Sequence, residues 1–233
     1  MLIASSQDDM SCRGGATSES GRTTQDDPRY VRVRAALRCA VLELAAQRPA
    51  EEISVAELTS AAGVSRTVFY SHASSPVRLL ADALVVELAP VLDGVETAMA
   101  TGRTQFGTVW RDGYLALLEH VEAHRAVYVT AVEARSGVVT ALVEYFAQLA
   151  AASVDAVAAR MAEPVSPLWR TMAVQQHAHG TIAMIETWVQ AAPGTSPHDV
   201  VAAYLALAPP WQLARPDADG QIVLHRGQGP RPA

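Results

Sequence analysis

The sequence predicts an all-α protein, in which a small N-terminal three-helix domain precedes a larger helical domain. Half of the chain is apolar and only 6% is aromatic. Alanine, valine and leucine supply most of the apolar residues, a composition that favours helices over sheets. Apolar residues recur at helical spacing along most of the chain, and no segment shows a convincing strand pattern. We therefore expect about nine helices.

Composition divides the chain into four parts. Residues 1–26 are rich in Ser, Gly, Thr, Asp and Gln and lack periodicity, so we expect a disordered tail. Residues 27–75 form the predicted small domain, and residues 76–208 form the predicted larger domain for ligand binding and dimerisation. Residues 209–233 are rich in Pro, Gly, Arg and Asp, and we expect a loose C-terminal tail.

The helix boundaries follow from start and stop signals. Asp27 followed by Pro28 is a capped helix start, and this first helix should end near residue 48. Ser75 followed by Pro76 starts a long helix. Pro90 either lies inside this helix or breaks it, and the helical pattern can continue to about residue 99. Helical periodicity then predicts helices over residues 104–123, 125–135, 138–161, 168–191 and 196–207.

Residues 54–72 contain the most specific local pattern. Ser54 can cap one short helix, and Glu57 three residues later completes a capping box. Gly63 follows, where a helix must end in a left-handed conformation that glycine adopts without strain. Ser65 then caps a second short helix. Two short helices joined by a tight glycine turn predict a helix-turn-helix, whose second helix can lie in a DNA major groove.

The charge distribution agrees with this interpretation. The formal net charge is -6, but residues 28–80 carry seven Arg and four acidic residues. Residues 81–208 carry six Arg and thirteen acidic residues. Binding to a polyanion requires local rather than global positive charge, so a basic DNA-binding domain and an acidic second domain are compatible.

The chain resembles the TetR family of bacterial transcription regulators. The residues that carry the resemblance are Ala62-Gly63-Val64-Ser65, Phe69-Tyr70, His72 and Ser75-Pro76, and His179-Gly180-Thr181 with Trp188 near the C-terminal end. The chain departs from the family pattern at Ala73, where a phenylalanine is usual, and at Pro76, where a phosphate-contacting lysine is usual. Arg78 is the candidate replacement for that lysine.

The resemblance implies a cytoplasmic DNA-binding regulator without a cofactor. We expect a repressor that is released from a double-stranded operator by a small hydrophobic effector, and that acts as a homodimer with no membrane partner. The first alternative is a helical small-molecule-binding protein with weakened or lost sequence-specific DNA binding, which the departures at Ala73 and Pro76 keep open. The second is a helical enzyme, but the sequence contains no recognisable catalytic motif.

The predicted DNA contacts lie on the two short helices. Arg66 can bind a guanine through two hydrogen bonds, and Val68 can meet a thymine methyl group. Hydroxyl and imidazole groups suit phosphate oxygens, which set register rather than sequence. The candidate residues are Thr59, Ser65, Arg66, Thr67, Val68, Tyr70 and His72.

Two further sets of residues are candidates in the larger domain. Scattered aromatic residues with one histidine can line a mostly apolar effector pocket, although an ordinary core is the alternative for each. The pocket candidates are Phe106, Trp110, Tyr114, Tyr128, Tyr145, Trp169 and His177. The family resemblance implies a dimer interface on the last two helices, with the candidates Gly180, Ala183, Met184 and Trp188. An intrachain core is the alternative there as well.

No metal site is predicted. His120 and His124 are four residues apart, a spacing that can chelate a metal ion on one helix. No third ligand is evident in the sequence, and the two cysteines lack metal-binding spacing. No run of the chain reaches the roughly 18 apolar residues of a membrane span.

Overall fold

The computed structural model describes residues 27–101, 106–215, 217 and 220–222. Within these residues it contains nine α-helices, and the prediction of an all-α fold is confirmed. The predicted disordered tail, residues 1–26, lies outside the described residues. The small domain comprises α1 (Pro28–Ala45), the short 3-10 helix η2 (Ala50–Glu52), α2 (Val55–Ala61) and α3 (Arg66–His72). The larger domain comprises α4 (Pro76–Thr101), α5 (Phe106–Ala123), α6 (Arg125–Glu133), α7 (Gly137–Ala158), α8 (Pro167–Val189) and α9 (Pro197–Leu207).

Local capping explains where the helices of the small domain begin. The Asp27 carboxylate accepts a hydrogen bond from the Arg29 amide at 2.8 Å. The Ser54 hydroxyl accepts from the Glu57 amide at 3.2 Å, while the Glu57 carboxylate pairs with Arg48. Each cap satisfies an amide that a helix N-terminus leaves without a partner. The turn between α2 and α3 contains Gly63 at a φ of 65°, the left-handed conformation that the sequence predicts.

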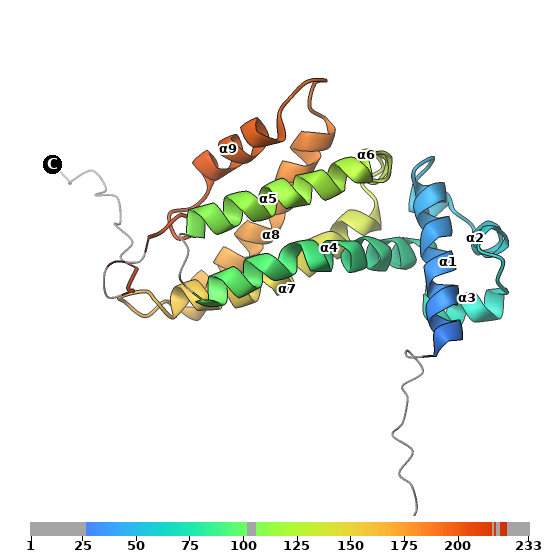
Figure 1. The fold of residues 1–233 in the computed structure, drawn as a ribbon, viewed down its shortest axis with the longest axis horizontal. Coiled ribbons are helices and arrows are strands. Elements are labelled where there is room, and N and C mark those ends of the chain that lie inside the picture. The colour runs from blue at the N-terminus through green and yellow to red at the C-terminus, as the bar shows by residue number, and fades with distance from the viewer. Residues whose placement is uncertain (1–26, 102–105, 216, 218–219, 223–233) are drawn as a thin grey trace, which may run out of the picture.

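Helix α4 connects the two domains (Figure 1). It leaves the small domain beside α1 and runs along the larger domain, where it packs against α5 and α7. Pro90 lies inside this helix without ending it. Leu80, Leu84 and Leu88 form a fully buried stripe along one side of α4, so packing on both neighbours stabilises the helix.

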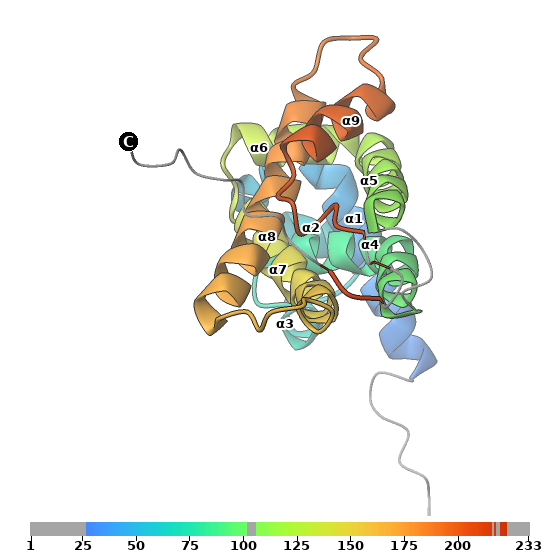
Figure 2. The same ribbon diagram turned by 90° about the vertical axis from the view of Figure 1, so that its left-hand side faces the viewer.

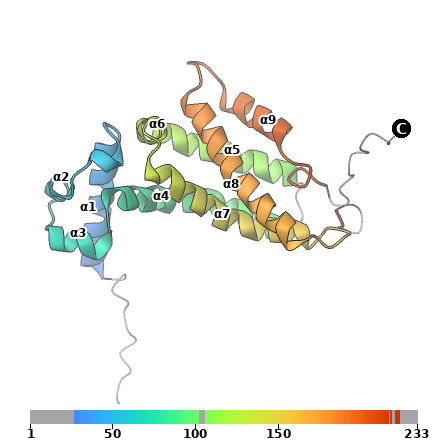
Figure 3. The ribbon, with the colours of Figure 1, turned by 180° about the vertical axis from the view of Figure 1, so that it is seen from behind.

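The larger domain is a helical bundle (Figures 2 and 3). Helix α7 packs against both α4 and α8, and α9 packs against α5 and α8. Seen from behind, α8 crosses the other long helices at an angle. The buried apolar residues of all these helices belong to one core, which continues into the small domain through α1 and α4.

One helix of the described residues, α7, is long and apolar enough to cross a membrane by length and composition. The sequence contains no uninterrupted apolar run of that length, because Glu144 and Asp155 lie within this segment. The side chains of Leu142, Phe146 and Val154 are buried against the neighbouring helices. Such packing is typical of a core helix.

The segment after α9 differs from the expectation. Residues 209–233 were expected to be loose, but Trp211 and Gln212 are buried, and Gln212 has no exposed surface. Ile222 is also buried, and its backbone forms an isolated β-bridge with Met161. A local run of Pro, Gly and charged residues does not reveal that a tryptophan within it packs on a distant helix. Residues 223–233 lie outside the described residues.

Side-chain hydrogen bonds join the small domain to the larger one. The Glu51 carboxylate of η2 accepts hydrogen bonds from the Ser136 hydroxyl and the Gly137 amide, both at 2.8 Å. These two donors form the N-terminus of α7, where a negative charge is favoured by the helix dipole. The Thr130 hydroxyl of α6 donates to the Ala45 carbonyl at 3.0 Å. The joint therefore consists of Glu51 at α7 and the end of α1 at α6.

We predict that Glu51→Gln lowers the free energy of unfolding by about 1 kcal/mol at neutral pH, since the carboxylate is exposed and screened by solvent. Burial raises the pKa of the Glu51 carboxyl, but the hydrogen bonds from Ser136 and Gly137 bring it below its ordinary value of 4.5. A carboxyl with a lowered folded-state pKa stabilises the fold above its unfolded pKa, and this contribution is lost as the pH falls.

Urea denaturation of the wild type and the variant between pH 3 and pH 7 measures this effect. The difference between them should shrink as the pH falls below 4.5. Glu52→Gln, an exposed neighbour in the same turn, is the matched control and should have little effect. A Glu51→Gln difference that does not change with pH would contradict the assignment.

Candidate DNA-binding surface and ligand cavity

Helix α3 is held in place by aromatic packing on its inner side. The Phe69 side chain is fully buried, and the Phe69 and Tyr70 rings meet edge to face at 5.2 Å. The His72 ring stacks on Tyr30 of α1, with the ring centroids 4.1 Å apart. Burial, with a smaller contribution from Arg34, lowers the pKa of His72. Helix α3 is therefore anchored to α1 along one side.

The opposite side of α3 is exposed. Arg66 and Thr67 lie at its first turn and are exposed, and Val68 is half-buried. Tyr70 is 62% exposed, which is unusual for a large aromatic side chain. Among the described residues, no ion pair involves Arg66. The exposed side of α3 thus presents a guanidinium and a hydroxyl from its first turn, and a phenol one turn later, to solvent.

Three of the predicted DNA contacts have intramolecular roles. Thr59 is only 5% exposed, and its hydroxyl donates to the Ala56 carbonyl of its own helix at 3.1 Å. The prediction of a phosphate contact by Thr59 is therefore wrong, because the side chain faces the core. The Ser65 hydroxyl caps α3 by accepting from the Val68 amide at 3.3 Å. His72 is half-buried against α1 rather than exposed beside Tyr70.

The two departures from the family pattern are accommodated locally. Ala73 ends α3 and is buried in the core. Pro76 begins α4, and the preceding Ser75 hydroxyl accepts from the Arg78 amide at 3.1 Å. The Arg78 guanidinium lies 3.0 Å from the Asp82 carboxylate one turn later. Arg78 is therefore engaged within α4, which weakens its case as a replacement phosphate anchor.

A cavity of about 40 Å³ lies among α4, α5, α7 and α8. Of the predicted pocket residues, Trp110, Tyr114 and His177 line it. The remaining wall is mostly apolar and includes Leu92, Val95, Phe146, Leu149, Ala150 and Thr181. The volume holds a few water molecules but is far below the roughly 300–1,000 Å³ of drug-sized ligand pockets. The cavity is therefore too small for a drug-sized ligand unless its walls move.

Two residues of the cavity wall, Tyr114 and His177, belong to a buried polar cluster with Gln212, which itself lines the groove between α8 and α9. The Gln212 amide donates a hydrogen bond to the Tyr114 hydroxyl, and its nitrogen lies 3.2 Å from Nδ1 of His177. Burial lowers the pKa of His177 to about 4, so its ring is neutral at neutral pH. Tyr204 of α9 makes an edge-to-face contact with Tyr114 at 4.9 Å. Sequence reasoning missed Gln212 because no periodic pattern includes it.

The other predicted pocket residues lie elsewhere. Tyr128 is buried edge-on to His120, 5.9 Å between ring centroids. Tyr145 is half-buried on α7 beside Phe146, and only Phe146 reaches the cavity. Trp169 packs against Trp211 at 6.1 Å. The side chain of Phe106 lies outside the described residues. Aromatic content alone therefore did not separate the cavity wall from the general core.

A wider groove, about 490 Å³ in volume, runs between α8 and α9. The predicted interface residues Gly180, Ala183 and Met184 line it, together with Leu207, which is 85% exposed. Met184 and Trp188 are nevertheless buried within the chain. Any Cβ at Gly180 would lie 2.7 Å from the Tyr204 hydroxyl, so this glycine permits close packing of α9 of the same chain.

The arrangement of helices is similar to that of solved structures. The chain is similar to the crystal structure of RolR without ligand, with 16% identity, a TM-score of 0.52, and coverage of 74% of this chain and 89% of RolR. The fold is TetR-like. The TetR-family repressor AlkX from Dietzia sp. matches at 14% identity and a TM-score of 0.48, covering 77% of this chain and 94% of AlkX. The fatty acid degradation regulator FadR from Bacillus halodurans matches at 13% identity and a TM-score of 0.48, covering 80% of this chain and 95% of FadR. No family model and no curated protein sequence matches the chain.

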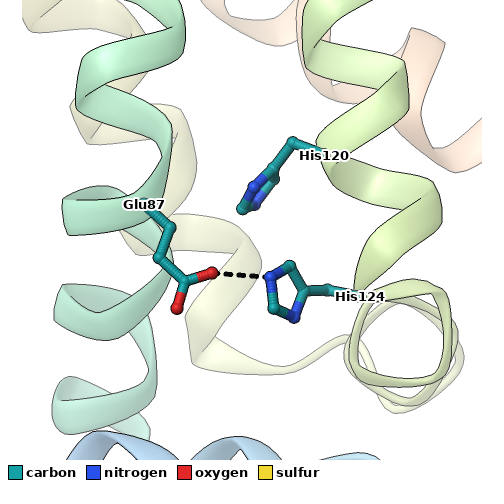
Figure 4. A group of neighbouring side chains, drawn as sticks. All are labelled: Glu87, His120 and His124. Carbon is teal, nitrogen blue, oxygen red and sulfur yellow. Dashed lines mark ion pairs between the residues drawn. The ribbon is translucent and has the colours of Figure 1, made fainter. Parts of the chain in front are cut away.

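Within the described part of this TetR-like chain, one group of three side chains can hold a metal ion. It consists of Glu87 on α4, His120 in the last turn of α5, and His124 at the junction between α5 and α6 (Figure 4). The sequence shows the histidine pair but no third ligand. The glutamate is supplied by a helix more than thirty residues earlier in the chain, which only the tertiary structure brings to the pair.

Proposed function

We propose that this protein is a TetR-family transcription regulator, a repressor that binds double-stranded operator DNA as a homodimer and releases it on binding a small effector. The observation that carries the proposal is the exposed first turn of α3, which presents Arg66 without an ion pair while the inner side of the helix is anchored. The basic small domain supports a polyanionic partner. The protein acts in the cytoplasm, without catalytic activity.

The mode of binding follows from the side chains that α3 exposes. Arg66 and Thr67 lie at the N-terminal end of the helix, where recognition helices contact base edges. The Arg66 fork matches the two acceptors of a guanine in the major groove. Tyr70, one turn later, is placed to donate its hydroxyl to a phosphate. Thr59 takes no part, since its hydroxyl is bonded within its own helix.

We predict that Arg66→Ala weakens binding to the operator by about 1–3 kcal/mol, the cost of one lost bidentate base contact. Binding to random DNA of equal length should change less, because that binding depends on phosphate contacts. Gel-shift titrations on the DNA flanking its own gene, at two salt concentrations, measure both quantities. Arg111→Ala is the matched control, since Arg111 is an exposed arginine on α5 that pairs with Asp112.

If Arg66→Ala weakened binding to operator and to random DNA equally, Arg66 would not contact bases. Binding by the wild type that depends on salt but shows no sequence preference would favour the second candidate function, a ligand-binding protein without a specific operator. The engagement of Arg78 with Asp82 is the observation that favours this candidate.

The groove between α8 and α9 is the proposed dimer interface, and a second copy of the chain is its occupant. A two-fold dimer places two recognition helices about 34–36 Å apart, one turn of DNA, which a monomer cannot do. The groove is lined by small and apolar side chains, and Leu207 exposes most of its surface beside it. Burial of this exposed apolar surface by a second copy would stabilise the dimer.

We predict that Leu207→Glu converts a dimer into a monomer, because a charge would be buried without a partner in the interface. Size-exclusion chromatography with light scattering at micromolar concentration checks this outcome. Val31→Glu, at a 53% exposed valine of α1, is the control and should stay dimeric. If the wild-type protein were a monomer under these conditions, the proposed homodimer would be wrong.

The effector is proposed to bind in the cavity among α4, α5, α7 and α8. Its apolar wall suits a hydrocarbon body, and the cluster of Tyr114, His177 and Gln212 suits one hydrogen-bonding group. Because the cavity is smaller than a drug-sized ligand, such a ligand must push the cavity walls apart. Helix α4 is one of those walls and continues into the small domain, so the ligand-bound state favours a different placement of α3.

We predict that alcohols and carboxylic acids of four to ten carbons raise the thermal denaturation midpoint of the wild type more than hydrocarbons of equal length, because only the former satisfy the polar cluster. Ala150→Leu should abolish these shifts by filling the cavity, at a cost of about 1–3 kcal/mol from overpacking. Circular dichroism verifies that this variant folds. Equal shifts in both proteins would place the ligand elsewhere.

A further inference from the structure

Three potential metal ligands converge between α4 and α5, close to the small domain. Glu87 projects from α4, and the rings of His120, in the last turn of α5, and of His124, just after α5, project toward it (Figure 4). The Glu87 Oε2 and His124 Nε2 atoms are 2.6 Å apart. One ligand atom from each of the three residues lies within 4.8 Å of the others. Ligands bound to one ion at about 2.0–2.2 Å are separated by distances of this order, so small side-chain rotations suffice.

His120 has no role within the protein that explains its position. Its Nε2 atom is buried and has no hydrogen-bond partner among the described residues. A buried polar atom without a partner costs about 1–3 kcal/mol.

We propose that Glu87, His120 and His124 bind one divalent transition-metal ion of the zinc class. Imidazole nitrogens from the end of α5 and from the junction with α6, with a carboxylate from α4, provide three ligands on one side of the ion. The fourth position is left to water or another small donor. Imidazole nitrogen favours zinc, cobalt or nickel, whereas calcium and magnesium require oxygen ligands.

Neighbouring side chains are placed to support this site. The Arg38 guanidinium of α1 lies 3.6 Å from Oε1 of Glu87, whereas Oε2 contacts His124, and a bound ion would replace that contact. The ring of Tyr128 packs edge-on against His120 and restricts its orientation. Outer-shell contacts of this kind orient metal ligands. Through Arg38, the ion would connect α5 and α4 to α1, and so stiffen the joint beside the small domain.

The test uses the full-length protein after treatment with a chelator, titrated with zinc chloride by calorimetry and with cobalt chloride by visible absorption. The expected result is one bound ion per chain and a visible absorption spectrum typical of cobalt bound by nitrogen ligands. Zinc should also raise the thermal denaturation midpoint. Glu87→Gln and His120→Ala should each weaken zinc binding by more than the about 10–100-fold that outer-shell partners contribute.

Matched controls separate this site from other metal-binding groups. His198→Ala removes an exposed histidine of α9, and Cys39→Ser removes an exposed thiol of α1, and both should bind zinc like the wild type. Circular dichroism checks that each variant folds, and Glu87→Gln keeps the side-chain shape. Zinc binding that is unchanged in Glu87→Gln and His120→Ala, or that is lost in Cys39→Ser, would overturn the proposal. The readouts do not involve DNA, so they are independent of the proposed function.

Discussion

The position of the small domain depends on two connections to the larger domain. One is the contact of Glu51 with α7, and the other is the continuation of the chain into helix α4. Glu51 accepts two hydrogen bonds at the N-terminus of α7, and α4 passes from one domain to the other without a break. The two connections differ in kind, because the first is a pair of hydrogen bonds at the surface and the second is a continuous helix. A surface contact of that strength can open, whereas the helix moves as a rigid element.

This arrangement gives a physical route from the larger domain to α3. Leu92 and Val95 of α4 line the cavity, and Glu87 lies before both of them on the same helix, between one and two turns from Leu92. An effector in the cavity and an ion at Glu87 would therefore act on one element. Each can change the placement of α3 only to the extent that it binds the two arrangements of α4 with different affinity. By the same linkage, operator DNA would change the affinity of the cavity for its ligand.

The side chains of α3 fall into two groups: some hold the helix in place, and others face solvent. Phe69 and His72 hold α3 on α1, and Arg66 and Tyr70 face solvent. Residues that support the helix are buried by apolar and stacking contacts, so their contribution is to stability. Residues on the solvent side contribute little to stability and are free for a partner. The proposed contacts of α3 with DNA rest on this division rather than on any single residue.

The sequence by itself determined the helices, because their ends depend on neighbours in the chain. Asp27, Ser54 and Ser65 cap the helices that they were expected to cap, and Gly63 has the left-handed conformation of the predicted turn. Periodicity also predicted the long helix that begins at Pro76 and the helical larger domain, whereas the sequence left open whether Pro90 ends that helix.

Only the tertiary structure decided which side chains face which neighbours. Thr59 turned inward, Gln212 joined the polar cluster from a segment without periodicity, and Met184 packed within its own chain. Glu87 met a histidine pair that is distant in the sequence. Local sequence patterns indicate the periodicity of an element and where it begins and ends. Which way a helix face points depends on how the helices pack, and residues far apart in the chain determine that packing.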